Sequence, residues 1–381
     1  MNHPDDRVDR DRELMATALA AATAADHRAS PNPTVGAVLA GPRGDLLAAA
    51  ASRPVGGPHA EVEVVRLAAG RTRGATLYVT LEPCDHQGRT PPCTAAIVAA
   101  GITRVVVAME DPNPVVSGRG VQRLRDAGLI VEVGLAAGPA QQLHRMYLLW
   151  ARRARPFVTL KFAASLDGRV TSARGDSRWI TSPAARHHAH LLRRRHDAIL
   201  VGIGTILADD PELTTRLAEP ADTRQPRRVV LDSRLRTPPH ARVLTPPAAG
   251  AAATLIATAP DPDPGRVRIL ESAGAEVLPV SQKDGRVDLA ALLAVLGSRG
   301  ISSLLVEGGP TVHGAFRDAG LGDGVVALLA PRLLGGTATP AAVGGHGAAT
   351  LAEAPVLVDV EVARAGVDVV VSGYSEVRQE G

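Results

Sequence analysis

The sequence has only two cysteines, Cys84 and Cys93, in 381 residues. Secreted scaffolds held together by disulfides carry many more, so this class of protein is disfavoured. The Ala-rich stretch from Ala16 to Ala25 differs from a signal peptide, because acidic and basic residues are mixed ahead of it and a Pro-Asn-Pro sequence follows it. We therefore expect a cytoplasmic protein with reduced cysteines.

Aromatic side chains, clustered positive charge and long apolar runs are also scarce. Aromatic residues make up 2% of the chain, which leaves too few stacking platforms for a dedicated single-strand binder. The net charge of +3 comes from arginines spread along the chain rather than from a basic stripe. No apolar run reaches the roughly 18 residues that span a bilayer. We expect neither nucleic acid nor a membrane as a partner.

The length of 381 residues favours two domains, since one core rarely covers so long a chain. Strand-like and helix-like segments alternate in both halves, which predicts two α/β domains. The charged sequence Arg152-Arg153-Ala154-Arg155-Pro156 suggests the boundary. We predict a first domain over 1–146, a linker over 147–156 and a second domain over 157–381.

Hydrophobic patterning and turn residues predict the elements. In the first domain we expect helices at 11–25, 59–69, from 93 onward, at 118–127 and from 138 onward, and strands at 35–39, 46–51, 75–81, 104–108 and 130–133. In the second we expect strands at 157–163, 198–201, 228–231, 254–257 and 302–306 and a helix at 187–195, with 245–265 as surface loop apart from its short strand.

The chemistry of the first domain is concentrated in His59, Cys84 and Cys93. One imidazole and two thiolates are the protein ligands of a zinc site that keeps its fourth position open for water. Glu61 lies two residues after His59, where a carboxylate can carry protons without binding the metal. This combination is typical of zinc deaminases. Both His59 and Cys93 are expected at helix amino termini, where the backbone amides favour a thiolate.

Two other interpretations of these residues remain open. Cys84 and Cys93 could form a disulfide, or His86 could close a purely structural zinc site. The second interpretation leaves Glu61 without a role. Eight residues separate the two cysteines, whereas the general deaminase signature is Cys-x-x-Cys, so the spacing needs its own explanation.

The second domain has glycines directly after two predicted strands. Gly308 and Gly309 follow the strand at 302–306, and such a turn lets backbone amides approach a phosphate at a helix terminus. Gly202 and Gly204 follow another strand, but Leu207 occupies the third glycine position of the dinucleotide fingerprint. We predict phosphate binding without a Rossmann motif.

These motifs together resemble one family, the bifunctional deaminase/reductase of riboflavin biosynthesis, and the resemblance covers nearly the whole chain. In the first half it rests on residues 32–36, His59-Ala60-Glu61, the eleven residues from Pro83 to Cys93, whose long spacing is typical of this family, and Asp111-Pro112-Asn113-Pro114. In the second half it rests on residues 161–168, 179–182, 207–211 and 307–310.

The resemblance implies a cytidine-deaminase-like α-β-α domain followed by a dihydrofolate-reductase-like α/β domain. The first would use Zn²⁺ to deaminate 2,5-diamino-6-(5-phosphoribosylamino)pyrimidin-4-one. The second would use NADPH to reduce the ribosyl arm, giving 5-amino-6-(5-phosphoribitylamino)uracil. The partner is then a small-molecule phosphoribosyl-pyrimidine, and we also expect a homo-oligomer.

The resemblance also implies roles for individual residues. Asn32 would orient the pyrimidine ring, and Glu61 would carry protons. Contacts to NADPH would come from Ala163, Trp179, Thr205, Asp209, Gly308, Gly309 and Thr311. Contacts to the second substrate would come from Ser177, Arg193, Arg216 and Glu307, with the arginines binding its phosphate.

Lys161 and Asp209 are both candidates for the catalytic proton transfer in the reduction. Lys161 and Lys283 are the only lysines in the chain, and Lys161 lies in a strand where a compact ammonium differs most from a guanidinium. Two further hypotheses for the whole chain are a nucleic-acid or nucleoside deaminase fused to an inactive module, and a deaminase fused to a regulatory nucleotide sensor.

Overall fold

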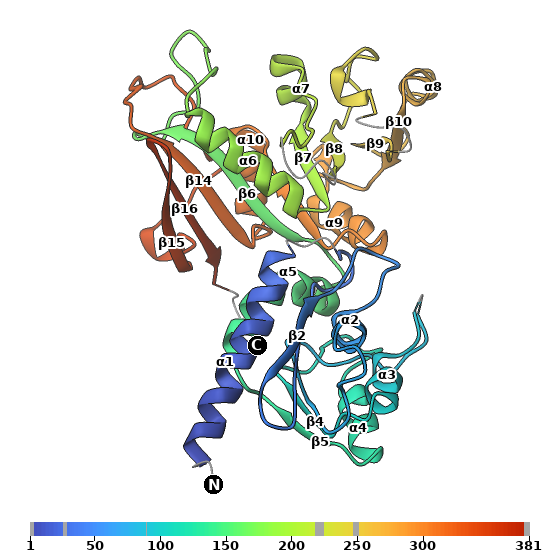
Figure 1. Ribbon diagram of the computed structural model, residues 1–381. Helices are drawn as coiled ribbons and strands as arrows, with labels where there is room; N and C mark the ends of the chain where they lie inside the picture. The colour runs from blue at the N-terminus through green and yellow to red at the C-terminus, as the bar shows by residue number, and fades with distance from the viewer. Residues whose placement is uncertain (1–3, 26–28, 89, 218–224, 247–250, 377–381) are drawn as a thin grey trace. The chain divides into compact units, whose positions relative to one another are not determined.

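The computed structural model describes residues 4–25, 29–88, 90–217, 225–246 and 251–376. The chain divides into two compact units, Met1–Ala154 and Arg155–Gly381. Each unit is built on its own sheet (Figure 1). None of the described helices is both long and apolar enough to span a membrane.

The first unit is a five-stranded sheet in the order β2-β1-β3-β4-β5. Strand β1 pairs antiparallel with β2 and β3, whereas β3, β4 and β5 run parallel. The strands are β1 (Gly36–Ala40), β2 (Leu46–Ala51), β3 (Thr76–Val79), β4 (Arg104–Val107) and β5 (Ile130–Val133), and the helices are α1 (Pro4–Ala24), α2 (Ala60–Leu67), α3 (Cys93–Ala99), α4 (Arg119–Asp126) and α5 (Ala137–Arg153).

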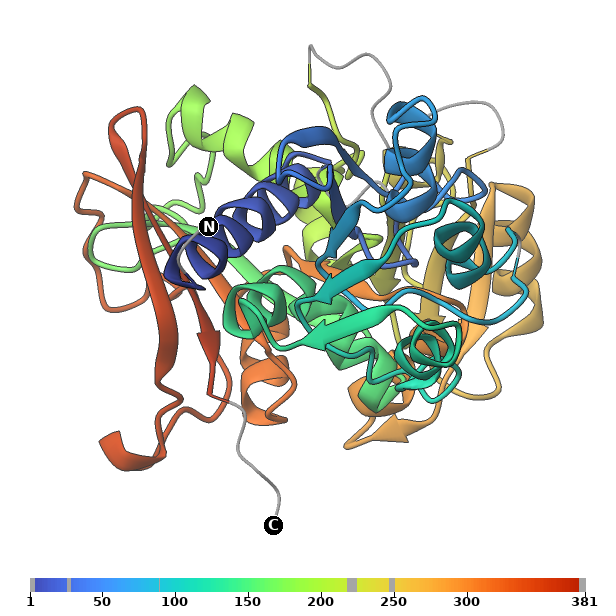
Figure 2. The same ribbon diagram turned by 60° about the horizontal axis from the view of Figure 1, so that its bottom comes forward.

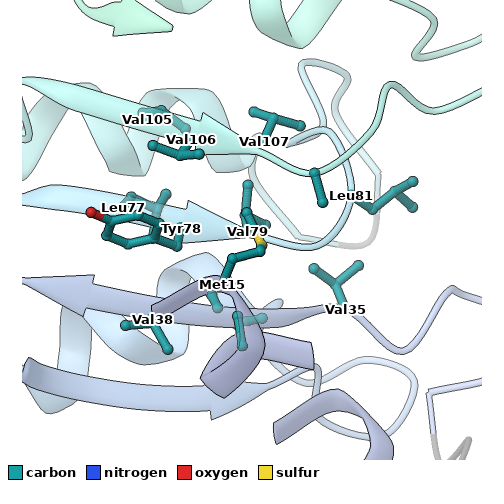
Figure 3. Packing of buried hydrophobic residues seen from close by; sticks show 14 of the residues in the cluster. Met15, Val35, Val38, Leu77, Tyr78, Val79, Leu81, Val105, Val106 and Val107 are labelled. Atoms are coloured by element: carbon teal, nitrogen blue, oxygen red, sulfur yellow. The ribbon is translucent and has the colours of Figure 1, made fainter. Parts of the chain in front are cut away.

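Helices cover both faces of this sheet. Helix α1 contacts α5, while α2 contacts α3, and α3 contacts α4 (Figure 1). Figure 3 shows Met15 of α1 reaching toward Val79 of β3 in the buried cluster. The central strands are buried on both faces, as the apolar run Val105-Val106-Val107 of β4 shows.

Two boundaries in the first unit differ from expectation. Helix α1 begins at Pro4, seven residues before the predicted Asp11, and the added turns contact the rest of the unit, since Arg7 donates to Glu132 at 2.7 Å and Arg10 to the Gly44 carbonyl at 2.9 Å. Helix α5 continues to Arg153, and its Tyr147 and Leu148 are buried in the first core. Most of the segment that we expected to be a linker, 147–156, is therefore the end of a packed helix.

The second unit is a nine-stranded sheet in the order β10-β9-β8-β7-β13-β6-β14-β16-β15. It is parallel from β10 to β14, and β16 and β15 add an antiparallel hairpin at one edge, drawn in red in Figure 2. Its strands are β6 (Phe157–Ser165), β7 (Ala198–Gly202), β8 (Arg227–Leu231), β9 (Thr254–Thr258), β10 (Ala275–Pro279), β13 (Ser303–Val306), β14 (Gly324–Ala330), β15 (Leu357–Ala365) and β16 (Asp368–Ser375).

The helices of this unit are α6 (Pro183–Arg195), α7 (Ile203–Asp209), α8 (Pro264–Ser272), α9 (Leu289–Ser298) and α10 (Pro310–Asp318), with short 3₁₀ turns η1 (Arg242–Leu244) and η2 (Leu351–Glu353) and a small ribbon of β11 (Gln282–Lys283) and β12 (Arg286–Val287). Helix α6 begins at Pro183 rather than at the predicted His187, because Ser182 caps it and Pro183 suits the first helical position.

The central parallel strands of the second sheet are buried on both faces, as the alternation in β7 demonstrates, whereas the edge strand β15 is mostly exposed. Ala198 and Leu200 pack into one cluster with α9 and α10, whereas Ile199 and Val201 pack into another with α7 and η1. Buried parallel strands of this kind place the residues that follow them at one edge of the sheet.

Candidate functional site

Three ligand atoms meet in the first unit. His59 is the N-cap of α2, Cys93 is the first residue of α3, and Cys84 lies in the segment after β3. His59 Nδ1 lies 3.2 Å from Cys93 Sγ and 3.6 Å from Cys84 Sγ, and the three ligand atoms all lie within 4.8 Å of one another. Zinc bonds of about 2.0–2.3 Å in tetrahedral geometry require ligand atoms about 3.5–3.8 Å apart, so these residues fit zinc.

The two alternative interpretations of the cysteines fail on geometry. Cys84 and Cys93 are both free thiols rather than a disulfide. Among the residues that the structure describes, the cluster contains His59, Cys84 and Cys93 and leaves His86 out. Three ligands leave a fourth zinc position open, as hydrolytic chemistry needs.

The surroundings of the cysteines favour a thiolate. A hydrogen bond from the Cys93 thiol lowers the pKa of Cys84, burial opposes this, and His59 lowers the pKa further. Cys93 is completely buried, whereas Cys84 is half-buried. The cluster is therefore accessible from the side of Cys84.

Glu61 sits in the first turn of α2 beside the cluster, with only 3% of its surface exposed. Burial raises the pKa of Glu61 to about 7, and the charge of Cys84 adds to this effect. Within the described part of the chain its Oε2 atom has no hydrogen-bond partner. A buried carboxyl that titrates near neutral pH and has one free oxygen is suited to carry a proton to and from a reactant.

The two cysteine segments are tied to each other. Thr94 donates its backbone N–H to the Cys84 carbonyl at 3.2 Å and its hydroxyl to Asp85 Oδ1 at 2.5 Å. Asp85, the residue after Cys84, is therefore bonded to Thr94, the residue after Cys93, and this contact holds the two ligand segments together.

Asn32 lies on an exposed loop before β1. Strand β1 is antiparallel to β3, with Ala37 opposite Val79, so the start of β1 and the end of β3 share one edge of the sheet. Cys84 follows β3 at that edge. The topology therefore brings the loop of Asn32 and the metal segment to the same end of the first unit.

In the second unit Lys161, Arg193 and Glu307 form a buried ionic cluster. Glu307 follows β13, and Val306 lies opposite Leu160 of β6, so the sheet register places Glu307 next to Lys161. Lys161 Nζ lies 3.7 Å from Glu307 Oε2. Arg193 on α6 donates to both carboxylate oxygens of Glu307, at 3.1 and 2.7 Å.

The charges of this cluster do not cancel. Burial raises the pKa of Glu307, but Arg193 and Lys161 outweigh it and lower that pKa to about 2. Burial lowers the pKa of Lys161, and Glu307 offsets part of this effect. Two cations around one carboxylate leave an excess positive charge that would attract an anionic ligand.

Arg216 joins the cluster through a residue that the sequence did not reveal. His190, three residues before Arg193 on α6, accepts the backbone N–H of Arg216 at its Nδ1 over 3.2 Å. Arg193 donates to the Thr214 carbonyl at 3.0 Å, and Arg216 donates to the Thr214 hydroxyl at 2.9 Å. Burial and then the charges of Arg193 and Arg216 lower the pKa of His190 to about 4. Its only signal in the sequence is the helical spacing to Arg193.

The two glycines after Glu307 differ in the space around them, since Gly308 is tightly packed and Gly309 is open. A Cβ on Gly308 would come within 2.6 Å of Val312 on α10, and one on Gly202 within 2.7 Å of the same side chain. Those two glycines are explained by close packing. Gly309, the N-cap of α10, has open space around its Cα, and Thr311 lies in the first turn. An approaching phosphate would therefore meet Gly309 and Thr311.

The other predicted cofactor residues lie around α7 and the loop before α6. Arg178 donates to the Asp209 carbonyl at 2.6 Å and lies 3.5 Å from its carboxylate, which ties the loop of Ser177 and Trp179 to the end of α7. Thr205 lies on the same helix. Ala163 on β6 is partly buried against the core cluster that contains residues of α6.

Trp179 itself is 63% exposed. The Arg186 guanidinium lies 4.5 Å from the centre of the Trp179 ring. The backbone carbonyl of Trp179 accepts a hydrogen bond from Arg332 at 3.5 Å. An exposed indole with a cation on one face can stack on a ligand with its other face.

Comparison with known proteins supplies the family. Residues 8–109 match the cytidine and deoxycytidylate deaminase zinc-binding region, and residues 156–371 match the RibD C-terminal domain. The riboflavin biosynthesis protein RibD of Bacillus amyloliquefaciens is 41% identical over 367 residues, which cover 96% of this chain and 97% of that protein. The chain belongs to the RibD family. RibD of Acinetobacter baumannii has the same fold, with a TM-score of 0.86 and 34% identity over 97% of this chain and 99% of that one.

A further RibD-like structure is a diaminohydroxyphosphoribosylaminopyrimidine deaminase/5-amino-6-(5-phosphoribosylamino)uracil reductase from Thermotoga maritima. It is 34% identical over 97% of this chain and 100% of that one, with a TM-score of 0.82. Membership of the RibD family confirms the predicted architecture, a cytidine-deaminase-like unit followed by a dihydrofolate-reductase-like unit.

The predicted enzyme class is confirmed as well, a bifunctional deaminase and reductase of riboflavin biosynthesis with a zinc-binding deaminase region. The reductase unit implies a nicotinamide cofactor. The hypotheses of an inactive second module and of a regulatory sensor therefore lose their support.

Proposed function

We propose that the enzyme deaminates 2,5-diamino-6-(5-phosphoribosylamino)pyrimidin-4-one in its first unit and reduces the product with NADPH in its second, giving 5-amino-6-(5-phosphoribitylamino)uracil. The observation that carries this proposal is the likeness to the Thermotoga maritima deaminase/reductase over 97% of the chain. The chemistry of the two clusters agrees with it, since one suits zinc hydrolysis and the other an anionic ligand.

In the deamination, His59, Cys84 and Cys93 would hold the zinc ion. When bound, zinc acts as a Lewis acid that lowers the pKa of a water molecule to near neutrality and supplies the nucleophile. Glu61 would carry a proton from the attacking water to the departing amino group, for which its raised pKa and its free Oε2 are suited. Asn32, at the same edge of the sheet, would orient the pyrimidine ring.

In the reduction, NADPH supplies the hydride. Arg193 and Arg216 bind the phosphate of the ribosyl arm, and Ser177 and Glu307 contact the rest of the substrate. The residues that would hold the cofactor are Ala163, Trp179, Thr205, Asp209, Gly309 and Thr311. Gly308 supports the turn by packing on Val312.

Of the two candidates for proton transfer in the reduction we favour Lys161. Its ammonium is 3.7 Å from Glu307, within the cluster that binds the substrate arm, and burial lowers its pKa toward the range of a proton donor. Asp209 is engaged by Arg178 at the end of α7, a position better suited to hold the cofactor loop.

The test is a two-step assay on the purified full-length protein. The diamino substrate alone should release one equivalent of ammonia, and later addition of NADPH should consume one equivalent of cofactor, with mass spectrometry identifying the ribityl product. Ammonia release without NADPH oxidation would refute the reductase half of the proposal, and oxidation with NADH but not NADPH would refute the cofactor assignment.

Two accompanying expectations are a homo-oligomer and a cytoplasmic location. The location rests on the use of Cys84 and Cys93 as thiolate ligands, which requires reduced cysteines. Light scattering of the purified enzyme measures the oligomeric state, and fractionation of cells that express it measures the location.

A further inference from the structure

A second buried carboxylate lies in the metal segment and takes no part in the proposed reaction. Glu82 comes two residues before Cys84, and only 4% of its surface is exposed. It is neither a member of the His59, Cys84 and Cys93 cluster nor paired with a cation in the ion pairs of the described residues. A buried carboxylate without a cation needs other groups to satisfy it.

Backbone amides satisfy Glu82. Its Oε2 accepts the N–H of Asp111 at 3.1 Å and that of Gly118 at 2.9 Å, and its Oε1 accepts the N–H of Val121 at 3.0 Å. Gly118 and Val121 belong to the N-cap and first turn of α4. One side chain thus fixes the start of α4 and the loop after β4 to the metal segment.

The backbone of the same segment is held from the same side. The Glu82 N–H donates to the Met109 carbonyl at 3.1 Å. Pro83, the residue after Glu82, packs closely on Gly120 of α4, and a Cβ on Gly120 would lie 1.8 Å from the Pro83 carbonyl oxygen. The residue directly before Cys84 therefore rests against the first turn of α4 with no room to move toward it.

The loop that Glu82 holds is itself braced by the motif Asp111-Pro112-Asn113-Pro114. The Tyr147 hydroxyl on α5 donates to both oxygens of Asp111, at 3.1 and 2.9 Å. Asp111 Oδ1 also accepts the N–H of Asn113 at 2.9 Å. The chain of contacts runs from α5 through Asp111 and Glu82 to Cys84.

We infer that Glu82 is a positioning residue for the zinc ligand Cys84, acting through its hydrogen bonds to the backbone of Asp111, Gly118 and Val121. This inference rests on the zinc site and is independent of which pyrimidine the enzyme takes. It also gives the Asp111–Pro114 motif a role, as the outer part of the same brace.

The sharpest test is Glu82→Gln, which keeps the size of the side chain. An ionised carboxylate accepts at both oxygens, whereas an amide presents its NH₂ group to the N–H donors on one side. In Glu82→Gln the NH₂ group therefore faces at least one of the three backbone N–H groups, and that hydrogen bond is lost. The matched control is Asp11→Asn, which changes a buried carboxylate in the same unit.

Asp11 is a suitable control because it lies at the other end of the strands. It accepts from Tyr78 at 2.5 Å and from Arg104 at 3.0 and 2.6 Å, and Arg104 pairs with Thr76, the first residue of β3. Cys84 follows the opposite end of that strand. Asp11→Asn should therefore lower thermal stability without changing the metal site.

The measurement is the affinity of each full-length variant for Zn²⁺, by competition with a chromophoric chelator, together with the thiolate-to-metal absorption of the Co²⁺-loaded protein. Loss of a group bonded directly to a metal ligand typically costs 10- to 100-fold in affinity. Glu82 acts on Cys84 through the backbone, so we take the lower end of this range. We expect Glu82→Gln to bind Zn²⁺ about tenfold or more weakly and to shift the Co²⁺ spectrum. Asp11→Asn should match the wild type in both.

An unchanged affinity and spectrum in Glu82→Gln, or a loss no larger than that in Asp11→Asn, would overturn the inference. If Glu82→Gln does not fold, Tyr147→Phe decides instead, because it removes only the hydroxyl that holds Asp111. A few-fold weaker Zn²⁺ affinity in that variant supports the brace, and wild-type affinity refutes it. Neither readout involves substrate, so both remain informative even if the proposed reaction is wrong.

Discussion

The two sites of this enzyme are assembled in different ways. The zinc ligands lie between residues 59 and 93, on α2, on α3 and on the segment after β3, and their residue types alone indicate the metal. The ionic cluster of the reductase draws Lys161 from β6, Arg193 from α6 and Glu307 from the end of β13, which only the sheet brings together. A site made of a metal and its ligands can be found from the sequence, whereas a site made of common charged residues depends on the topology.

The largest expected effect breaks one site and leaves the other intact. Cys84→Ala removes one of three ligands, so the protein should lose its zinc and release ammonia only at the background rate. Reduction of substrate that has already been deaminated should be unchanged, because the chain forms two compact units with separate cores. Metal analysis, ammonia release and NADPH oxidation measure the three quantities.

The reciprocal variant is Lys161→Ala, which should lose reduction while keeping zinc and ammonia release. If either folded variant lost both activities, the two sites would not be independent.

The next effect separates proton transfer from metal binding within the first site. Glu61→Gln should retain about one zinc per chain, since Glu61 lies outside the ligand cluster, yet slow ammonia release by roughly 100-fold or more. Loss of zinc from this variant would mean that Glu61 is a ligand, and a normal rate would mean that another group carries the proton.

The contrast between the sites also explains what could be predicted. Element type in the first unit followed from alternation and from the glycines and prolines between the strands, and the positions of His59 and Cys93 at the starts of α2 and α3 were correct. The linker predicted over 147–156 was wrong because the charged residues at 152–155 suggest solvent, while the burial of Tyr147 and Leu148 on α5 is a tertiary effect.

The supporting residues of both sites were not accessible from the sequence. Glu82 and His190 act through backbone N–H groups of residues far along the chain, at Gly118 and Val121 for Glu82 and at Arg216 for His190. Such hydrogen bonds leave no pattern of residue types. For Gly308 the sequence suggested a phosphate contact that the structure does not require. Its close packing on Val312 explains why this position is a glycine.

A smaller effect concerns the pH dependence of the second site. The pKa of His190 falls from an ordinary 6.5 to about 4 in the folded protein, through burial and the charges of Arg193 and Arg216. Below pH 6.5 the unfolded chain binds a proton that the folded chain refuses until about pH 4, so stability is lost as the pH falls through this window. His190→Gln removes this proton uptake.

Denaturant titrations at pH 7 and pH 5 should therefore show a smaller loss of stability in His190→Gln than in the wild type, by about 1–2 kcal/mol, the lower figure allowing for solvent screening of this partly buried group. His187→Gln, at an exposed position of the same helix, serves as the control and should behave like the wild type. An equal loss in all three proteins would mean that His190 does not sense the arginines around it.

The smallest effect concerns Trp179, the exposed residue in the loop before α6. The Arg186 guanidinium lies 4.5 Å from the centre of its ring, so the nicotinamide cofactor would stack on the other face of the ring. A stacking contact of about 0.5–1 kcal/mol predicts that Trp179→Ala weakens NADPH binding roughly two- to fivefold while sparing ammonia release.

Trp150 is the other tryptophan and lies on α5, so Trp150→Phe leaves Trp179 as the only tryptophan that fluoresces. In that background NADPH should quench or shift the emission. If neither the emission nor the affinity changes, Trp179 serves only as the partner of Arg186, and the predicted cofactor site must be built on Thr205, Gly309 and Thr311 instead.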